Sequence, residues 1–189
     1  MKLIKKTCNL FILLLSCSVI VGCTKVPAQR TINLIETNNS SINRASQKQK
    51  MLKKNNCLIK IHKVIDNRNY KNNIGIFCDS EIITNDLSGW ISRSLVALEN
   101  TPQLLNENEI LLDVFIKKLY IKHIGTSKVA TIVLQVDYIK NKNLTLSRIY
   151  RKQLATINWN ATENEIVTLL NNVLKLVMDD IINDVVSLI

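Results

Sequence analysis

Apolar and polar side chains alternate along three successive stretches in the second half of the chain, which is the pattern of half-buried strands. The first stretch, 109–123, shifts its alternation by one position partway, so we expect a β-bulge near Lys117–Lys118 that keeps both halves on one face. The second stretch follows the polar residues 125–127, and the turn residues 141–143 lead into a third strand at 144–159. The pattern predicts a three-stranded antiparallel meander.

Two further stretches carry apolar residues every three or four positions, which is the spacing of amphipathic helices. The first begins at Asp86 or Ser88, either of which can cap a helix, and its apolar stripe includes Trp90 as an expected core anchor. The second begins at a capping box formed by Thr162 and Glu165 and continues through the last residues of the sequence. Its broad apolar ridge suits packing across the meander.

Shorter alternating segments precede the first helix. Residues 58–65 form one strand candidate and residues 72–77 another, separated by the polar turn 66–70. We expect these two candidates to pair as a hairpin. The element order is then strand, helix, three-stranded antiparallel meander and long C-terminal helix packed on the sheet, so the fold class is α+β.

The N-terminal residues have the organisation of an export signal. Three lysines precede an apolar run, Leu10–Val21, which is shorter than the roughly 20 apolar residues that span a bilayer. The run ends in Ile20–Val21–Gly22–Cys23, which resembles the lipobox of bacterial lipoproteins. The resemblance implies acylation of Cys23 by fatty acids such as palmitate and removal of residues 1–22 as a lipoprotein signal peptide; an uncleaved N-terminal anchor helix is the alternative. Because Thr24 and not an aspartate follows, the sorting rule of enteric bacteria indicates the outer membrane, on its periplasmic face, with the inner membrane as the alternative.

Behind the signal we expect the acylated cysteine with a basic, flexible tether at 23–56, and then a periplasmic α+β domain at 57–189. The tether carries only one acidic residue, Glu36, against these basic ones: Lys25, Arg30, Arg44, Lys48, Lys50, Lys53 and Lys54. Such a segment can lie against anionic lipid headgroups, where each cation contributes about 1 kcal/mol. A solvated linker is the plainer interpretation and the favoured one. Export and the small number of aromatic residues argue against nucleic acid as a partner.

Export also bears on the state of the cysteines. Cys57 and Cys78 are the two that neither leave with the signal nor carry the anchor, and the periplasm is oxidising. In the expected hairpin they face each other, so a disulfide that stabilises the fold by about 3 kcal/mol is one outcome. A pair of small buried thiols is the other.

The sequence offers few groups for catalysis. His62 lies in the first strand candidate and His123 at the end of the first meander strand, and neither belongs to a metalloprotease, nucleophile-elbow or phosphate-loop motif. Asp179, Asp180 and Asp184 lie on the last helix, where we expect a solvated face because no turn-shaped loop accompanies them. We therefore expect no catalytic, cofactor-binding or metal-binding residue and no enzymatic activity.

The element order behind a lipobox resembles that of small Gram-negative lipoproteins, in particular the YajG-like family. The segments that carry the resemblance are Ile61–Arg68, Leu119–Tyr120 and Val173–Asp180. The family implies the same fold over residues 57–186 and offers no functional residue to carry over. Auxiliary lipoproteins of lipid-transporting ABC systems have the same element order, as does the lipoprotein of the lipopolysaccharide-assembly barrel. The latter usually has Gly-Trp-x-Leu after its cysteine, a stretch that is absent here.

Two functions follow as hypotheses. The first is a non-catalytic, lipid-anchored binding or assembly module with an envelope protein as partner, which an exposed apolar patch or an open sheet edge would mark. The second is an accessory lipoprotein of a lipid or lipopolysaccharide transport system, which an apolar groove between helix and sheet would mark. An envelope hydrolase is a third hypothesis and the least favoured.

Overall fold

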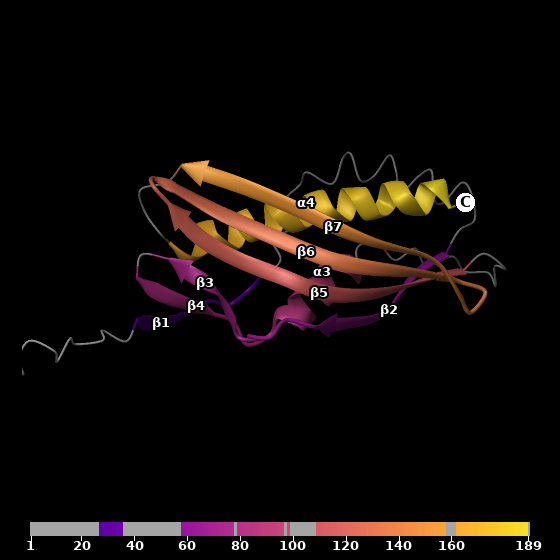
Figure 1. Cartoon of the computed structure of the whole chain (residues 1–189), viewed down its shortest axis with the longest axis horizontal. Helices are drawn as coiled ribbons and strands as arrows, with labels where there is room; N and C mark the ends of the chain where they lie inside the picture. The colour runs from indigo at the N-terminus through magenta and orange to yellow at the C-terminus, as the bar shows by residue number, and fades with distance from the viewer. Residues whose placement is uncertain are drawn as a thin grey trace, which may run out of the picture.

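In the part of the chain that the structure describes, seven strands form one mixed sheet, and two helices pack against it (Figure 1). The structure is a computed structural model that describes residues 27–35, 58–77, 79–96, 98, 109–157 and 162–188. The helices are α3 (Leu87–Val96) and α4 (Glu163–Ser187). The strands are β1 (Ala28–Thr31), β2 (Leu58–Asp66), β3 (Asn73–Phe77), β4 (Ser80–Ile83), β5 (Glu109–Ile124), β6 (Ser127–Lys140) and β7 (Asn143–Ile157). The α+β class is confirmed, and four strands precede α3, including the two candidates at 58–65 and 72–77.

The predicted meander is present as β5, β6 and β7. Strands β5 and β6 pair antiparallel along their whole length, and the register shifts between Ile116 and Lys118, where the sequence predicted a bulge. Strands β6 and β7 meet at a two-residue turn in which Asn141 and Lys142 both have positive φ, 54° and 65°. Two such residues define the type I′ turn that suits the twist of a hairpin.

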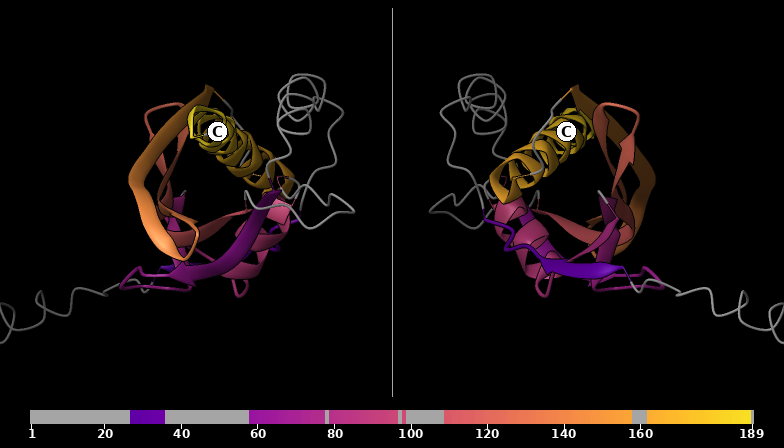
Figure 2. Two further views of the ribbon diagram at one scale, coloured as in Figure 1. Left: turned by 90° about the vertical axis from the view of Figure 1, so that its right-hand side faces the viewer. Right: turned by 90° about the vertical axis from the view of Figure 1, so that its left-hand side faces the viewer.

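Helix α4 lies in the hollow of the curved sheet, as Figure 2 shows. Its start is the predicted capping box: the Glu165 amide donates to the Thr162 hydroxyl, and the Thr162 amide donates to the Glu165 carboxylate. The Glu165 carboxylate also pairs with Lys128 of β6, a lysine that is almost completely buried. Trp90 of α3 is fully buried, as predicted, and its indole N–H donates to the Asn171 side chain of α4 at 3.1 Å.

A polar chain fixes the other end of α4 against the meander. The hydroxyls of Tyr138 and Tyr150 contact each other, and Tyr150 donates to Asp184 of α4. Asp184 also accepts from Arg148 at 2.6 Å, and Asp180 pairs with a second basic residue of β7, Lys152, at the same distance. The solvated acidic face expected for these aspartates is wrong for Asp184, whose side chain is only 14% exposed, because the curvature of the sheet brings basic residues of β7 alongside the helix (Figure 2). The Asp180 side chain is 38% exposed.

Strands β2 and β3 do not form the expected hairpin. Both pair in parallel with the same edge of β5: Leu58–Asp66 lies along Glu109–Ile116, while Gly75 and Ile76 lie beside Ile121 and Lys122. Because β5 is long, it accommodates the two shorter strands end to end. The alternation of apolar and polar residues predicted both strands but could not assign their neighbours.

The break between β2 and β3 is filled by Arg68. Its guanidinium makes a two-pronged contact with Asp66 at 2.9 and 3.0 Å, and its side chain is only 6% exposed. The same group donates to the carbonyl oxygens of Asn73 at 2.9 Å and Leu119 at 3.3 Å, and also to that of Lys71. These carbonyls lie where the ladder is interrupted, so Arg68 replaces the backbone donors that a continuous strand would supply.

Glycine is required where β3 pairs with β5. Gly75 has a φ of 136°, and a Cβ atom there would lie 1.9 Å from the carbonyl oxygen of Ile121. No side chain fits at that distance, so only glycine lets the two backbones approach closely enough to pair.

The expected start of the domain at residue 57 is too late. Strand β1 pairs in parallel with β4, and the segment that follows buries Ile32 and Leu34 in the core. The Asn33 amide donates to Glu163 at 2.9 Å, and the Ile35 carbonyl accepts from Asn171 at 3.0 Å. Residues 28–35 are therefore part of the domain and not of a flexible tether, while residues 36–57 lie outside the described part of the chain. Among the described residues, no helix is both long and apolar enough to cross a membrane.

Substituting Arg68 with alanine should lower the free energy of unfolding by about 3 to 5 kcal/mol, because it leaves Asp66 buried and uncompensated. Lysine at this position should also destabilise the domain, since a single ammonium cannot reach the carboxylate and the carbonyls together. Urea unfolding of the full chain measures both effects. Arg93→Ala is the control: Arg93 and its partner Asp86 are both more than half exposed, so its loss should cost less than about 1 kcal/mol. Equal losses for the two alanine variants would contradict the role assigned to Arg68.

Candidate functional site

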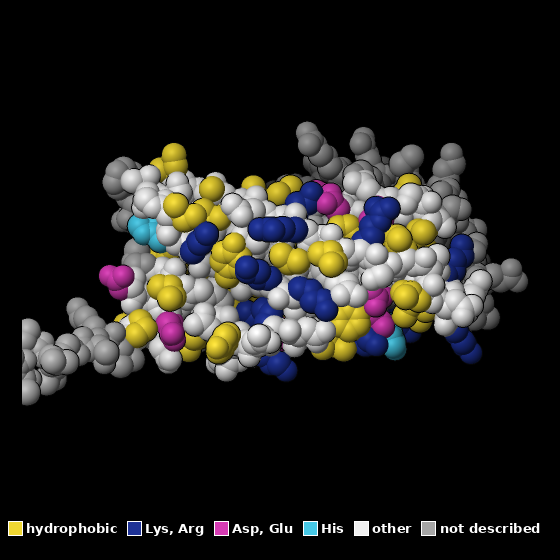
Figure 3. Space-filling view, in the orientation of Figure 1, with side chains coloured by type: hydrophobic (Ala, Val, Ile, Leu, Met, Phe, Trp, Pro, Cys, Tyr) yellow, Lys and Arg dark blue, Asp and Glu magenta, His cyan; other side chains and the backbone are white. Residues whose placement is uncertain are grey.

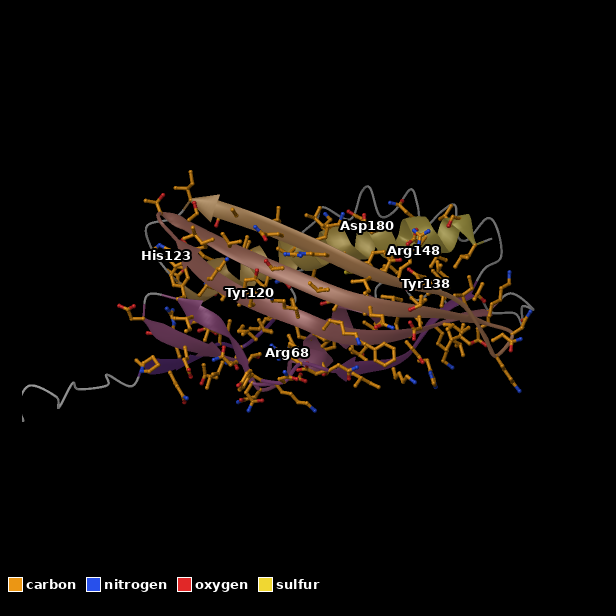
Figure 4. All side chains as sticks on the ribbon, viewed as in Figure 1. Arg68, Tyr120, His123, Tyr138, Arg148 and Asp180 are labelled. Atoms are coloured by element: carbon orange, nitrogen blue, oxygen red, sulfur yellow. The ribbon has the colours of Figure 1, made fainter. Side chains whose placement is uncertain are left out.

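The break between β2 and β3 opens a groove on the outer face of the sheet, away from α4. The groove has a volume of about 810 Å³ and is open to solvent. Arg68 forms part of its wall, between the two strands (Figure 4). The side chains that give the groove its chemical character are Tyr70, Ile76, Lys117, Lys118, Tyr120 and Lys122.

Positive charge gathers around Tyr120. The ammonium groups of Lys118 and Lys122 lie 4.7 and 5.8 Å from the centre of its ring, within the range of cation–π contacts. Arg151 belongs to the same group, because Val133 of β6 is the register partner of both Lys118 and Arg151. A hydrogen bond with Thr131, together with these neighbouring cations, lowers the pKa of the Tyr120 hydroxyl.

Few carboxylates balance this charge. In the part of the chain that the structure describes, Lys117, Lys118, Lys122 and Arg151 form no ion pair with an acidic side chain. The acidic residue that lines the groove is Glu81 of β4. We call these four cations, with Tyr120, the basic patch; Figure 3 shows basic side chains spread over this face with apolar ones between them.

Apolar side chains are exposed beside the basic patch. Tyr70 is 80% exposed, Ile76 is 56% exposed, and Ile149 on the outer face of β7 is 68% exposed. The outer edge of β7 is a second open feature, because this strand ends the sheet among the described residues. An exposed apolar surface and an open edge are the two features that the sequence analysis associated with a binding module.

The two histidines lie far apart. His62 Nδ1 contacts Asp113 of β5 at 2.7 Å, whereas His123 packs against the ring of Phe77 with the ring centres 5.2 Å apart. Asp113 and His123 are ten positions apart on one strand, which corresponds to about 33 Å. The nearest hydroxyl in the row of Asp113, Ser147, donates to a different carboxylate, that of Asp137, at 2.5 Å. The described residues therefore bring together an Asp–His pair but no Ser–His–Asp arrangement.

Asp113 is held ionised by its neighbours. Burial by itself raises the pKa of its carboxyl, but hydrogen bonds from Lys63, at 2.8 Å, and from His62 outweigh burial, so the pKa is lowered overall. The Lys63 ammonium also offsets the negative charge of Asp137, which lies directly across from Asp113 on β6. This polar row stabilises the outer face of the sheet and presents no reactive group.

The remaining predicted site residues are not tested by the geometry. Cys23, Cys57 and Cys78 lie outside the described residues, so acylation and the disulfide stay predictions. The geometric argument for the disulfide no longer holds, because the hairpin on which it rested does not form. No group of three or more His, Cys, Asp or Glu side chains in the described ranges could hold a metal ion.

The sequence analysis missed the basic patch and the groove. Lys117 and Lys118 were identified only as a bulge, and Lys122 and Arg151 were not singled out at all. Their proximity depends on the register of three strands, and the groove depends on an interruption of the sheet edge. The adjacent lysines at the bulge were the one local signal that polar side chains gather there.

No family model matches the chain, and no curated protein matches it. Among solved structures, a protein of the DUF330 family from Xanthomonas campestris has a TM-score of 0.50 at 10% identity, covering 82% of this chain and 92% of that protein. An uncharacterized protein gives a TM-score of 0.48 at 13% identity, with 85% and 99% covered. A minor lipoprotein from Acinetobacter baumannii gives 0.37 at 13% identity, with 66% and 92% covered. The first similarity shows a shared fold alone.

Asp113→Asn should lower stability at neutral pH by about 1.5 to 3 kcal/mol, the magnitude typical of a hydrogen bond to a charged group. The folded-state pKa of Asp113 lies below its unfolded value of about 3.9, so its contribution is complete above that pH and is lost as the pH falls through the folded-state value. Urea unfolding at pH values from 2 to 7 should show the two proteins converging below about pH 4. Lys63→Met should reduce the same pH dependence, and a difference that stayed constant down to pH 2 would rule out this explanation.

Proposed function

We propose that this chain is a lipid-anchored, non-catalytic protein of the cell envelope that acts as a binding or assembly module. The lipobox ending in Cys23 supports the anchor, and the outer face of the sheet supplies the binding surface. We place the protein at the outer membrane, facing the periplasm, because Thr24 follows the anchor cysteine; the inner membrane is the alternative. The resemblance to the YajG-like family stays a prediction.

The basic patch is the observation that carries the binding role. Four like charges close together on one face repel each other, so they reduce the stability of the fold. Other basic residues in the described part of the chain do pair with carboxylates, as Lys128 does with Glu165 and Arg148 with Asp184. A cluster that lowers stability and has no carboxylate partner among the described residues is better explained by a ligand that supplies the missing negative charge.

The hydrolase hypothesis receives no support from the geometry. Catalysis by an Asp–His pair needs a nucleophile within hydrogen-bond reach of the imidazole, and Ser147 is instead bonded to Asp137. The transport-accessory hypothesis is also less favoured, because it expected an apolar groove between helix and sheet. The described part of that interface is filled by fully buried side chains such as Val173, Val177 and Ile181 of α4.

Cys23→Ser should abolish lipid attachment, because the serine hydroxyl cannot replace the acylated thiol. Mass spectrometry of the protein from membranes should find the wild-type chain beginning at residue 23 with added acyl mass, and the variant as an unlipidated precursor that retains Met1. Cys17→Ser, a change within the expected signal, is the matched control and should leave acylation intact. A wild-type protein that keeps Met1 and carries no acyl group would overturn the proposed anchoring.

A further inference from the structure

The first strand leaves little chain between the anchor cysteine and the folded domain. Ala28 pairs with Ser80 of β4 and is therefore fixed in the sheet. Cys23 precedes Ala28 by five positions, and a fully extended chain covers about 3.5 Å per residue, so the two are at most about 18 Å apart. A domain anchored at Cys23 must lie against the bilayer and cannot extend away from it on a long tether.

The basic patch begins close to this attachment point. Gln29, Glu81, Ile76 and Lys122 are register partners across β1, β4, β3 and β5, so they form one row over the sheet. Three inter-strand spacings of about 4.8 Å place Lys122 about 14 Å from β1 along that row. Lys118 and Arg151 continue from there along the outer face of the meander, since both are register partners of Val133. Figure 3 shows basic side chains spread along this face.

The two sides of the domain differ in charge. Helix α4, on the opposite side of the sheet, carries a single basic residue, Lys175, against these acidic ones: Glu163, Glu165, Asp179, Asp180 and Asp184. Glu165, Asp180 and Asp184 are ion-paired with Lys128, Lys152 and Arg148, so the side that carries α4 is close to neutral. An anionic surface therefore attracts the outer face more strongly than the side that carries α4. The exposed Tyr70 and Ile76 beside the patch suit the boundary between headgroups and acyl chains, where aromatic and apolar side chains accompany basic ones.

We propose that the basic patch docks on the anionic phospholipid headgroups of the membrane that holds the anchor, so that the outer face of the sheet lies on the bilayer and α4 faces away from it. This inference rests on the lipid anchoring proposed above and deepens it by naming the ligand of the patch. Lys117, Lys118, Lys122 and Arg151 contact lipid phosphates, while Tyr70 and Ile76 lie at the interface. The anchor then fixes the orientation of the domain as well as its location.

The orientation can be tested with photocrosslinking probes on the acylated full chain in vesicles. Gln153 is exposed on the outer face beside the patch, and Asn172 is exposed on α4, so p-benzoylphenylalanine at each position reports one side of the domain. The vesicles contain phosphatidylethanolamine with about one quarter phosphatidylglycerol, and vesicles of phosphatidylcholine provide the neutral comparison. We expect lipid adducts at position 153 to exceed those at 172 at least fivefold, and only in the anionic vesicles.

Charge variants separate the patch from a general effect of net charge. K118Q/K122Q should reduce the adduct at position 153 at least fivefold, since each cation near an anionic surface contributes about a fivefold change in binding. K140Q/K142Q removes the same charge at the turn between β6 and β7, away from the patch, and should leave the adduct unchanged. All of these positions are exposed or half-buried, and unfolding curves that match the wild type will verify folding.

Each outcome decides the docking proposal. Equal lipid adducts at the two positions, adducts independent of phosphatidylglycerol, or equal effects of the two charge variants would overturn it. An adduct from position 153 to an envelope protein in native membranes, in place of lipid, would also overturn it and would assign the patch to a protein partner. Failure of the anchor is visible separately, because an unlipidated chain would not float with neutral vesicles at all.

Discussion

The long strand β5 is the constraint on which the rest of the structure depends. It pairs with β6 on one edge and, on the other, with two shorter strands placed end to end, so its second edge is interrupted. A buried interruption leaves carbonyl groups without donors, and Arg68 supplies those donors while its charge is neutralised by Asp66. Arg68 therefore bridges the gap between β2 and β3 on this edge, next to strand β2, on which α3 packs.

The interruption that needs Arg68 also creates the candidate site. A continuous strand would close the groove that Tyr70 and Tyr120 line, and the bulge opposite the break turns Lys117 and Lys118 toward solvent. The inner face of the same strands is filled by α4 and the core, so recognition is left to the outer face. Most of the buried core thus lies on one side of the sheet and the proposed binding surface on the other. The repulsion among the cations of the basic patch therefore does not disturb the core.

The inclusion of β1 in the sheet shortens the link between the domain and the proposed lipid anchor. A tether of more than thirty residues would let the domain rotate freely and search a volume above the membrane. With Ala28 fixed beside Ser80, at most five residues separate the domain from the proposed anchor at Cys23, so the proposed anchor would hold one face of the domain close to the membrane. The proposed anchor and the proposed electrostatic attraction would then reinforce each other, as a lipid chain and a basic surface do when either alone binds weakly.

The sequence by itself determined the elements whose signals are local. The capping box at Thr162, the bulge beside Lys118 and the burial of Trp90 follow from periodicity and from hydrogen bonds between near neighbours, and all three are present. Strand partners could not be predicted in the same way, because alternation assigns a residue to a face of the sheet but not to a neighbouring strand. The prediction that β2 and β3 form a hairpin was therefore wrong, and β1 was missed. The basic patch, the role of Arg68 and the pairing of Asp184 with β7 were decided only by tertiary structure, because each depends on register or curvature that joins residues far apart in the chain.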